Sequence, residues 1–216
     1  GAISAVYQRS YQEFPMAKSV VDLDIAFGFS AKGADVERRS GSAIQYYVTT
    51  GYLGDHRFAL LRQEANALRQ RLGRQGASHV MAFFDENSSD DARWTAGHSF
   101  TRENYAFLLE KVLDEPWFGL LLKPKVPSTL RRRLGPVAPL LEQALKTGRC
   151  ELYEQGALHG SYPPAAAALA SDLAVHGHLF AATAGIEAAL AGVRTLLMDR
   201  DGWPVSPFYR LGIGRV

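Results

Sequence analysis

The sequence predicts an α/β fold in which helices cover both faces of a parallel sheet. From His79 onward, short apolar segments alternate with segments whose apolar residues recur at helical spacing. The lengths of both kinds of segment fit βαβ units, which build parallel sheets. The predicted strands are residues 79–84, 118–122, 151–153, 173–176 and 195–198. The predicted helices are residues 101–113, 138–146, 164–171 and 183–191.

The first 76 residues show a different pattern. Residues 2–7, 23–29 and 43–49 are predicted strands, separated by turns that glycines mark. A helix is predicted at residues 57–72, and Gly73 and Gly76 end it. We therefore predict two domains, residues 1–76 and 77–216, with the boundary near Gly76.

The composition narrows the class of protein. The 24 Lys and Arg against 22 Asp and Glu give no sign of a nucleic-acid or anionic membrane partner. The single cysteine, Cys150, excludes an intramolecular disulfide and favours a reducing, cytoplasmic setting. No apolar run is long enough to span a membrane. The sequence starts without Met and stops at Arg215 and Val216 in what resembles the start of a strand, so we expect a portion of a longer protein.

Ligands of parallel α/β sheets bind at the carboxyl ends of the strands. The loops after Phe84, Leu122, His176 and Met198 are therefore the predicted site.

Two lysines follow the strand predicted at residues 118–122. Lys123 and Lys125 flank Pro124, which keeps the chain from extending the strand. Their ammonium groups suit a diphosphate, because each is a mobile charge with three donors. The alternative is a solvated loop. The basic run at residues 131–133 also reads as a solvated helix face.

Small residues open the helix predicted at residues 183–191. Thr183 is a candidate N-cap, and Ala184 and Gly185 leave room for a phosphate at the first backbone N–H groups. Glu187 lies four residues after this cap, whereas a capping box needs three. It is therefore a candidate acceptor of hydrogen bonds from ribose hydroxyls. The alternative is an acid favoured by the helix dipole.

Acidic residues follow the strand predicted at residues 79–84. Asp85, Glu86 and Asn87 come directly after it, with Asp90 and Asp91 nearby. Their spacing does not match a calcium loop. We predict a polar loop that contacts a substrate hydroxyl, and no metal site.

Four histidines are less informative. His176 and His178 flank Gly177 at a strand end, where they could contact a ligand, and His178 is a candidate substrate-binding residue. A third metal ligand is lacking. His98 and His159 read equally as loop residues or as acid–base groups.

Taken in order, these segments resemble the GT-B glycosyltransferases, most closely the bacterial enzymes of capsule and surface-polysaccharide biosynthesis. The resemblance covers the chain from about Ser78 onward and is loose before it. Its segments are V-M-A-F-F-D-E-N (80–87), G-L-L-L-K-P-K (119–125), A-S-D-L-A-V (170–175), T-A-G-I-E-A-A-L-A-G (183–192) and T-L-L-M-D (195–199). It implies a Rossmann-like fold, represented here by the end of an N-terminal domain and a truncated nucleotide-sugar-binding domain.

The resemblance also implies an activity. A sugar would pass from a nucleoside-diphosphate donor to a polysaccharide or glycan acceptor, without a cofactor or a metal. Glu187 would hold the ribose, residues 183–185 the phosphates, and Lys123 or Lys125 the diphosphate. No catalytic base is identified, because most of the N-terminal domain lies outside this sequence, so the fragment alone is expected to be inactive. Attachment to the inner membrane would also depend on parts outside it.

Two alternatives stay open. A nucleotide-sugar epimerase shares the architecture and would need carboxylates and a base near the sugar, for which Asp85, Glu86 and His178 are placeholders. A non-catalytic sugar-nucleotide-binding module is the other, because a fold does not determine a function.

Overall fold

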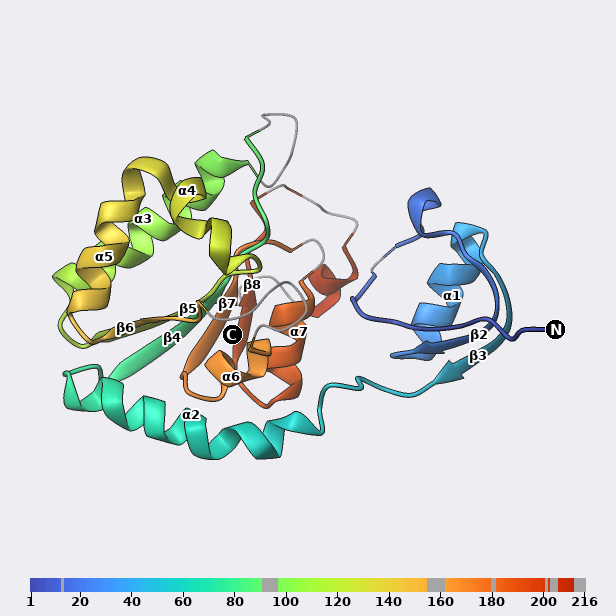
Figure 1. The fold of residues 1–216 in the computed structure, drawn as a ribbon, viewed down its shortest axis with the longest axis horizontal. Helices are drawn as coiled ribbons and strands as arrows, with labels where there is room; N and C mark the ends of the chain where they lie inside the picture. The colour runs from blue at the N-terminus through green and yellow to red at the C-terminus, as the bar shows by residue number, and fades with distance from the viewer. Residues whose placement is uncertain are drawn as a thin grey trace. The chain divides into compact units, whose positions relative to one another are not determined.

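The computed structural model describes residues 1–12, 14–90, 97–154, 162–179, 182–200, 202 and 206–211. The chain divides into two compact units. The first comprises Gly1–His56 together with residues near the C-terminus, and the second comprises Arg57–Gly202 (Figure 1).

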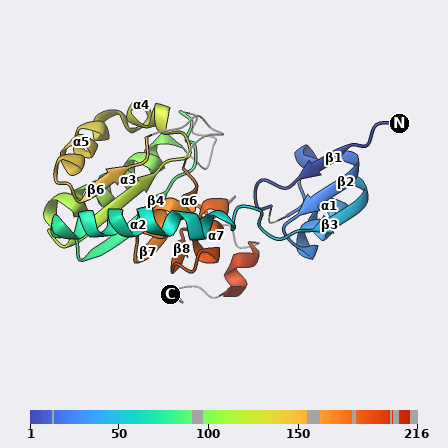
Figure 2. The same ribbon diagram turned by 60° about the horizontal axis from the view of Figure 1, so that its bottom comes forward.

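The first unit is built on a parallel sheet with the strand order β1-β2-β3. Its strands are β1 (Ala5–Tyr7), β2 (Asp22–Gly28) and β3 (Ala43–Thr49). Helix α1 (Ala31–Ser40) connects β2 to β3 and lies on one face of the sheet (Figure 2). The three strands confirm the prediction, but α1 replaces a predicted turn.

Helix α1 has clear ends and little apolar pattern. The Ser30 side chain caps it by accepting a hydrogen bond from the Gly33 N–H, and Gly41 ends it with a φ of 94°. Val36 is its only buried residue, so no apolar periodicity reveals the helix in the sequence. The Tyr47 hydroxyl fills the space that a Cβ at Gly28 or at Gly33 would need.

The other face of this sheet carries exposed apolar side chains. Register pairs Ile25 with Tyr46 and Phe27 with Val48, which places these four residues on one face. Tyr46 is 61% exposed and Val48 is 41% exposed. In α/β proteins both faces of a parallel sheet are normally covered.

The second unit contains a five-stranded parallel sheet with the order β6-β5-β4-β7-β8. The strands are β4 (His79–Phe84), β5 (Phe118–Lys123), β6 (Cys150–Leu152), β7 (Leu173–His176) and β8 (Thr195–Leu197). The helices are α2 (Arg57–Arg74), α3 (His98–Asp114), α4 (Leu130–Leu134), α5 (Ala138–Lys146), α6 (Pro164–Ala168) and α7 (Thr183–Leu190).

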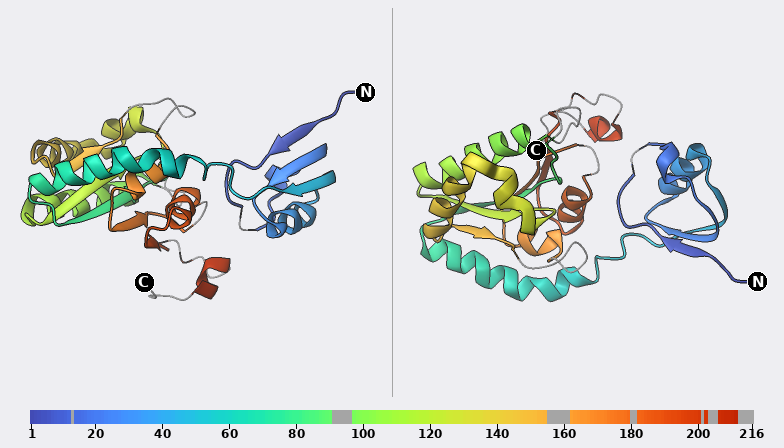
Figure 3. Two further views of the ribbon diagram at one scale, coloured as in Figure 1. Left: turned by 90° about the horizontal axis from the view of Figure 1, so that it is seen from below. Right: turned by 45° about the horizontal axis from the view of Figure 1, so that its top comes forward.

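Two hydrophobic cores cover the two faces of this sheet. Helices α3, α4 and α5 enclose one core, in which Tyr105, Leu130 and Leu141 are fully buried. Helices α2, α6 and α7 enclose the other (Figure 3). The protein is therefore α/β with parallel sheets flanked by helices, consistent with a Rossmann-like fold, and the predicted fold class is confirmed.

Helix α2 packs with the second unit. Its buried residues Ala65 and Leu72 lie in the same core as Phe84, Leu121 and residues of α6. The predicted domain boundary near Gly76 follows this helix, whereas the packing groups the helix with the second unit from Arg57 onward. Within the described ranges, no helix has the length and apolar character needed to cross a membrane.

Candidate ligand site at the carboxyl ends of the strands

The predicted polar residues meet at one edge of the five-stranded sheet. Phe84, the last residue of β4, is paired with Lys123 on β5 and with His176 on β7. Because β4 lies between these two strands, the residues that follow all three are neighbours in space. The predicted loops after β4, β5 and β7 are thus brought together.

Asp85 accepts four hydrogen bonds from described residues at this edge. Its Oδ2 accepts hydrogen bonds from the Tyr105 hydroxyl and from both terminal nitrogens of Arg133, all at 3.1 Å. Its Oδ1 accepts the backbone N–H of Lys125 at 2.6 Å. Burial raises the pKa of Asp85, while the Arg133 charge and these hydrogen bonds act in the opposite direction. Asp85 therefore holds the loop after β5 in place.

The burial of Arg133 contradicts the solvated helix face predicted at residues 131–133. Arg133 is 2% exposed and forms an ion pair with Asp85. The spacing contains the signal that identifies it. Leu130, Arg133 and Leu134 are separated by three and four positions and so share one face of α4, which is buried.

Glu86 and Lys125 form an ion pair at the rim of the edge. The Glu86 side chain is 17% exposed and that of Lys125 is 47% exposed. Burial raises the pKa of Glu86, Lys125 opposes this shift, and the Asp85 charge adds to it. A diphosphate that binds Lys125 must therefore compete with the Glu86 carboxylate.

Lys123 is buried, and its Nζ donates to the Pro124 carbonyl oxygen at 3.3 Å. Burial lowers the pKa of Lys123, and the charges of Asp85 and Glu187 oppose the shift. The two predicted lysines therefore lie in different environments, one within the protein and one at its surface.

His176 is fully buried at the end of β7. Its Nδ1 lies 2.6 Å from the His178 carbonyl oxygen and 3.3 Å from the His178 backbone nitrogen. The shorter contact requires the proton on Nδ1, because a carbonyl oxygen only accepts, and the neutral ring then has its lone pair on Nε2. Nε2 has no hydrogen-bond partner in the part of the chain that the structure describes, and lies 3.7 Å from Glu86 Oε1. Burial lowers the pKa of His176 to about 4, so the ring is neutral near pH 7.

Helix α7 begins at Thr183, with Ala182 in the cap position and no side-chain capping bond. Thr183 is thus the first helical residue and not the predicted cap. Gly185 has a packing role, because a Cβ there would lie 2.6 Å from Leu197 Cδ2 and 3.2 Å from His176 Cβ. Ala184 packs against the core beneath α7. Close helix–sheet packing therefore accounts for these small residues.

Glu187 is 3% exposed, and its Oε1 accepts the backbone N–H of Ala165 at 2.9 Å. The cap position of α6 is Pro163, which makes no side-chain capping bond. Glu187 therefore stabilises the start of α6 from a neighbouring helix. Spacing along α7 alone could not have shown this role.

The remaining candidates lie around this cluster. Asn87 is exposed, and His178 is buried. Ser88 is close to both His98 Nδ1, at 2.7 Å, and Arg133, at 3.3 Å. Burial lowers the pKa of His98, and the nearby arginines add to the shift. Asp91 and His159 lie outside the described residues.

Comparison with known proteins leaves the family of the chain open. No protein-family model matches the sequence, and no curated protein matches it significantly. Across the described ranges, no group of three His, Cys, Asp or Glu residues is placed to hold a metal ion. The fold and the site define an α/β protein whose larger parallel sheet has a charged, partly buried edge at the carboxyl ends of its strands.

Proposed function

We propose that the second unit binds a nucleoside-diphosphate sugar at the carboxyl edge of its sheet, and that the protein transfers the sugar to a saccharide acceptor in the cytoplasm. The observation that carries the proposal is the strand order. The chain builds β4, β5 and β6 toward one side and then returns to place β7 and β8 on the other side of β4. Ligands of open α/β sheets bind at such a switch point.

The residues at the switch point support this ligand class. Lys125 is half-exposed and can exchange the Glu86 carboxylate for a diphosphate. Helix α7 follows β7 directly, so the positive end of its dipole faces the same edge. In this proposal these charges stabilise the diphosphate as it leaves the sugar, with no requirement for a metal.

In this proposal, Glu187 binds the ribose of the nucleotide. One of its oxygens bonds the Ala165 N–H. The same carboxylate would accept from the ribose hydroxyls. Replacement of Glu187 by Gln tests this role, because a loss of nucleotide affinity with unchanged stability is expected only if the ribose is bound there.

Nucleotide binding tests the proposal. We expect UDP, GDP, ADP or CMP to raise the melting temperature of the protein. Lys125→Ala should weaken binding of the diphosphate far more than that of the free nucleoside, whereas Lys111→Ala, at an exposed position of α3, should change neither. The proposal fails if a folded sample responds to none of the four nucleotides. Equal losses for diphosphate and nucleoside would show that Lys125 acts on structure.

A nucleotide-sugar epimerase is the second candidate, and the position of buried, neutral His176, with its Nε2 3.7 Å from Glu86 Oε1, favours it. Both groups have shifted pKa values, as acid–base residues often do. An epimerase that removes a carbon-bound hydrogen of the sugar as a proton exchanges it with solvent, so incubation with nucleotide sugars in D2O without an acceptor would incorporate deuterium. A transferase would leave the sugar unlabelled, and a non-catalytic module would bind the nucleotide sugar without turnover.

A further inference from the structure

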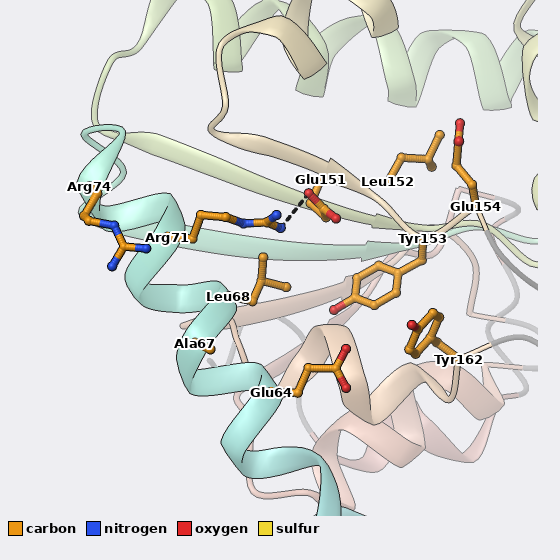
Figure 4. A pocket seen from close by; sticks show the side chains of 10 residues that line it. All are labelled: Glu64, Ala67, Leu68, Arg71, Arg74, Glu151, Leu152, Tyr153, Glu154 and Tyr162. Atoms are coloured by element: carbon orange, nitrogen blue, oxygen red, sulfur yellow. Dashed lines mark ion pairs between the residues drawn. The ribbon is translucent and has the colours of Figure 1, made fainter.

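A groove of about 610 Å³ lies between helix α2 and the end of edge strand β6 (Figure 4). Its volume falls in the range of small-molecule sites, about 300–1,000 Å³. All of its lining residues belong to the second unit. They are Glu64, Ala67, Leu68, Arg71, Arg74, Glu151, Leu152, Tyr153, Glu154 and Tyr162.

One wall is a single face of α2. Its lining residues recur at three- and four-residue spacing, which places them above one another on the helix. Ala67 and Leu68 form an apolar patch, with Glu64 on one side and Arg71 and Arg74 on the other (Figure 4). Glu64 and Arg74 form no ion pair with any described residue.

The opposite wall comes from β6 and the chain around it. Arg71 reaches across the groove and forms an ion pair with Glu151 at 2.8 Å. The rings of Tyr153 and Tyr162 meet edge to face, with centroids 5.4 Å apart. The Tyr153 ring projects toward α2 (Figure 4).

The Tyr153 hydroxyl is a donor without an acceptor among the described residues. It makes no hydrogen bond to any residue in the described ranges, although the side chain is half-buried. Burial raises the pKa of Tyr153, so the hydroxyl keeps its proton near neutral pH. The groove thus offers a polar group that a bound molecule could satisfy.

We propose that this groove binds a neutral saccharide. The carboxylates of Glu64 and Glu151 oppose an anion, and the guanidinium groups of Arg71 and Arg74 oppose a cation. A sugar hydroxyl donates to a carboxylate and accepts from a guanidinium at the same time, so both kinds of group are used. The apolar C–H face of a sugar ring fits the Tyr153 and Tyr162 rings and the Leu68 patch. The proposal stands on the groove and does not depend on the nucleotide site.

A glycan array carrying neutral oligosaccharides tests the proposal. The protein should retain at least one of them, and the retained oligosaccharide should show saturation transfer from the protein in NMR. Tyr153→Phe keeps the ring and removes one donor, so the Kd should rise about 2- to 12-fold. Arg71→Ala removes a charged donor, and the Kd should rise about tenfold or more.

Arg62→Ala is the matched control, because Arg62 is exposed on α2 and does not line the groove. It should leave the Kd unchanged, and circular dichroism should show that all variants are folded. The proposal is overturned if no oligosaccharide is retained. It is also overturned if Tyr153→Phe and Arg71→Ala bind the retained oligosaccharide as well as Arg62→Ala does. Nucleotide-induced stabilisation is a separate measurement, so either site can fail without the other.

Discussion

Removal of the Arg133 side chain should strongly destabilise the second unit. In Arg133→Met, the buried Asp85 carboxylate loses two hydrogen bonds and its ion-pair partner. Loss of one partner from a buried pair costs about 3–5 kcal/mol. For a unit of this size, that corresponds to a fall in Tm of roughly 6–20 °C. Arg132→Met, at an exposed position of the same helix, should change stability by at most about 0.5 kcal/mol.

The penalty should also depend on pH. Without Arg133, the pKa of Asp85 rises further, because burial then acts with less opposition. A carboxyl group whose folded pKa lies above its unfolded value is stable when protonated and loses stability as pH rises through the folded pKa. The Arg133→Met penalty should therefore be smaller at pH 5 than at pH 8.

Urea unfolding followed by circular dichroism measures both effects. Asp85→Asn combined with Arg133→Met should cost less than the sum of the single changes, because no unpaired charge stays buried. Equal stability of Arg133→Met and Arg132→Met would refute the assigned role of Arg133. A penalty that grows toward low pH would refute the assigned charge of Asp85.

Three further outcomes are expected. Gly185→Ala should lower the free energy of unfolding by about 1–3 kcal/mol in urea, because the added Cβ would overlap Leu197. Gly73→Ala is the control and should be neutral or stabilising, because nothing lies within 4 Å of its Cβ position. His176 should stay neutral above about pH 5 in an NMR titration, and the stability it contributes should be lost as pH falls from 6.5 toward 4. A measured pKa near 6.5 would contradict its burial. Glu187→Gln should weaken nucleotide binding by about 1–2 kcal/mol, and less for a 2′-deoxy nucleotide; calorimetry that finds a loss of stability with unchanged affinity would remove the ribose role.

The fold of the second unit could be predicted because its pattern is local. Strands β4 and β7 and helix α5 have the predicted bounds, as does β3 in the first unit. The other strands and the longer helices differ from prediction by a few residues at their ends. Helix α1, in the first unit, was not predicted, because Val36 is its only buried residue and its sequence therefore has no apolar periodicity. In the short helix α4, the sequence indicates a helix face at residues 131–133, but the three consecutive basic residues suggest that all of them are solvated, whereas Arg133 is buried.

The sequence predicts where the polar residues of the candidate site lie, but not which of them bond to one another. The sequence places Glu86, Lys125 and His176 at strand ends, and a parallel sheet brings such ends together. It cannot show that Lys125 pairs with Glu86, or that Glu187 bonds a residue 22 positions earlier. Such contacts depend on tertiary packing, which no local spacing contains.

The strand order also governs how the second unit can form during synthesis. The middle strand, β4, is made early, yet its β7 side is completed only by residues far along the chain, such as Asp172, which bonds the Val80 N–H across 92 positions. At about 5–20 residues per second, a ribosome needs roughly 5–18 s to cover that distance. Meanwhile β4 has one unpaired, apolar edge, which is a template for pairing between chains. The nascent chain is therefore open to aggregation during this interval, and synthesis that pauses before β7 should increase the hazard.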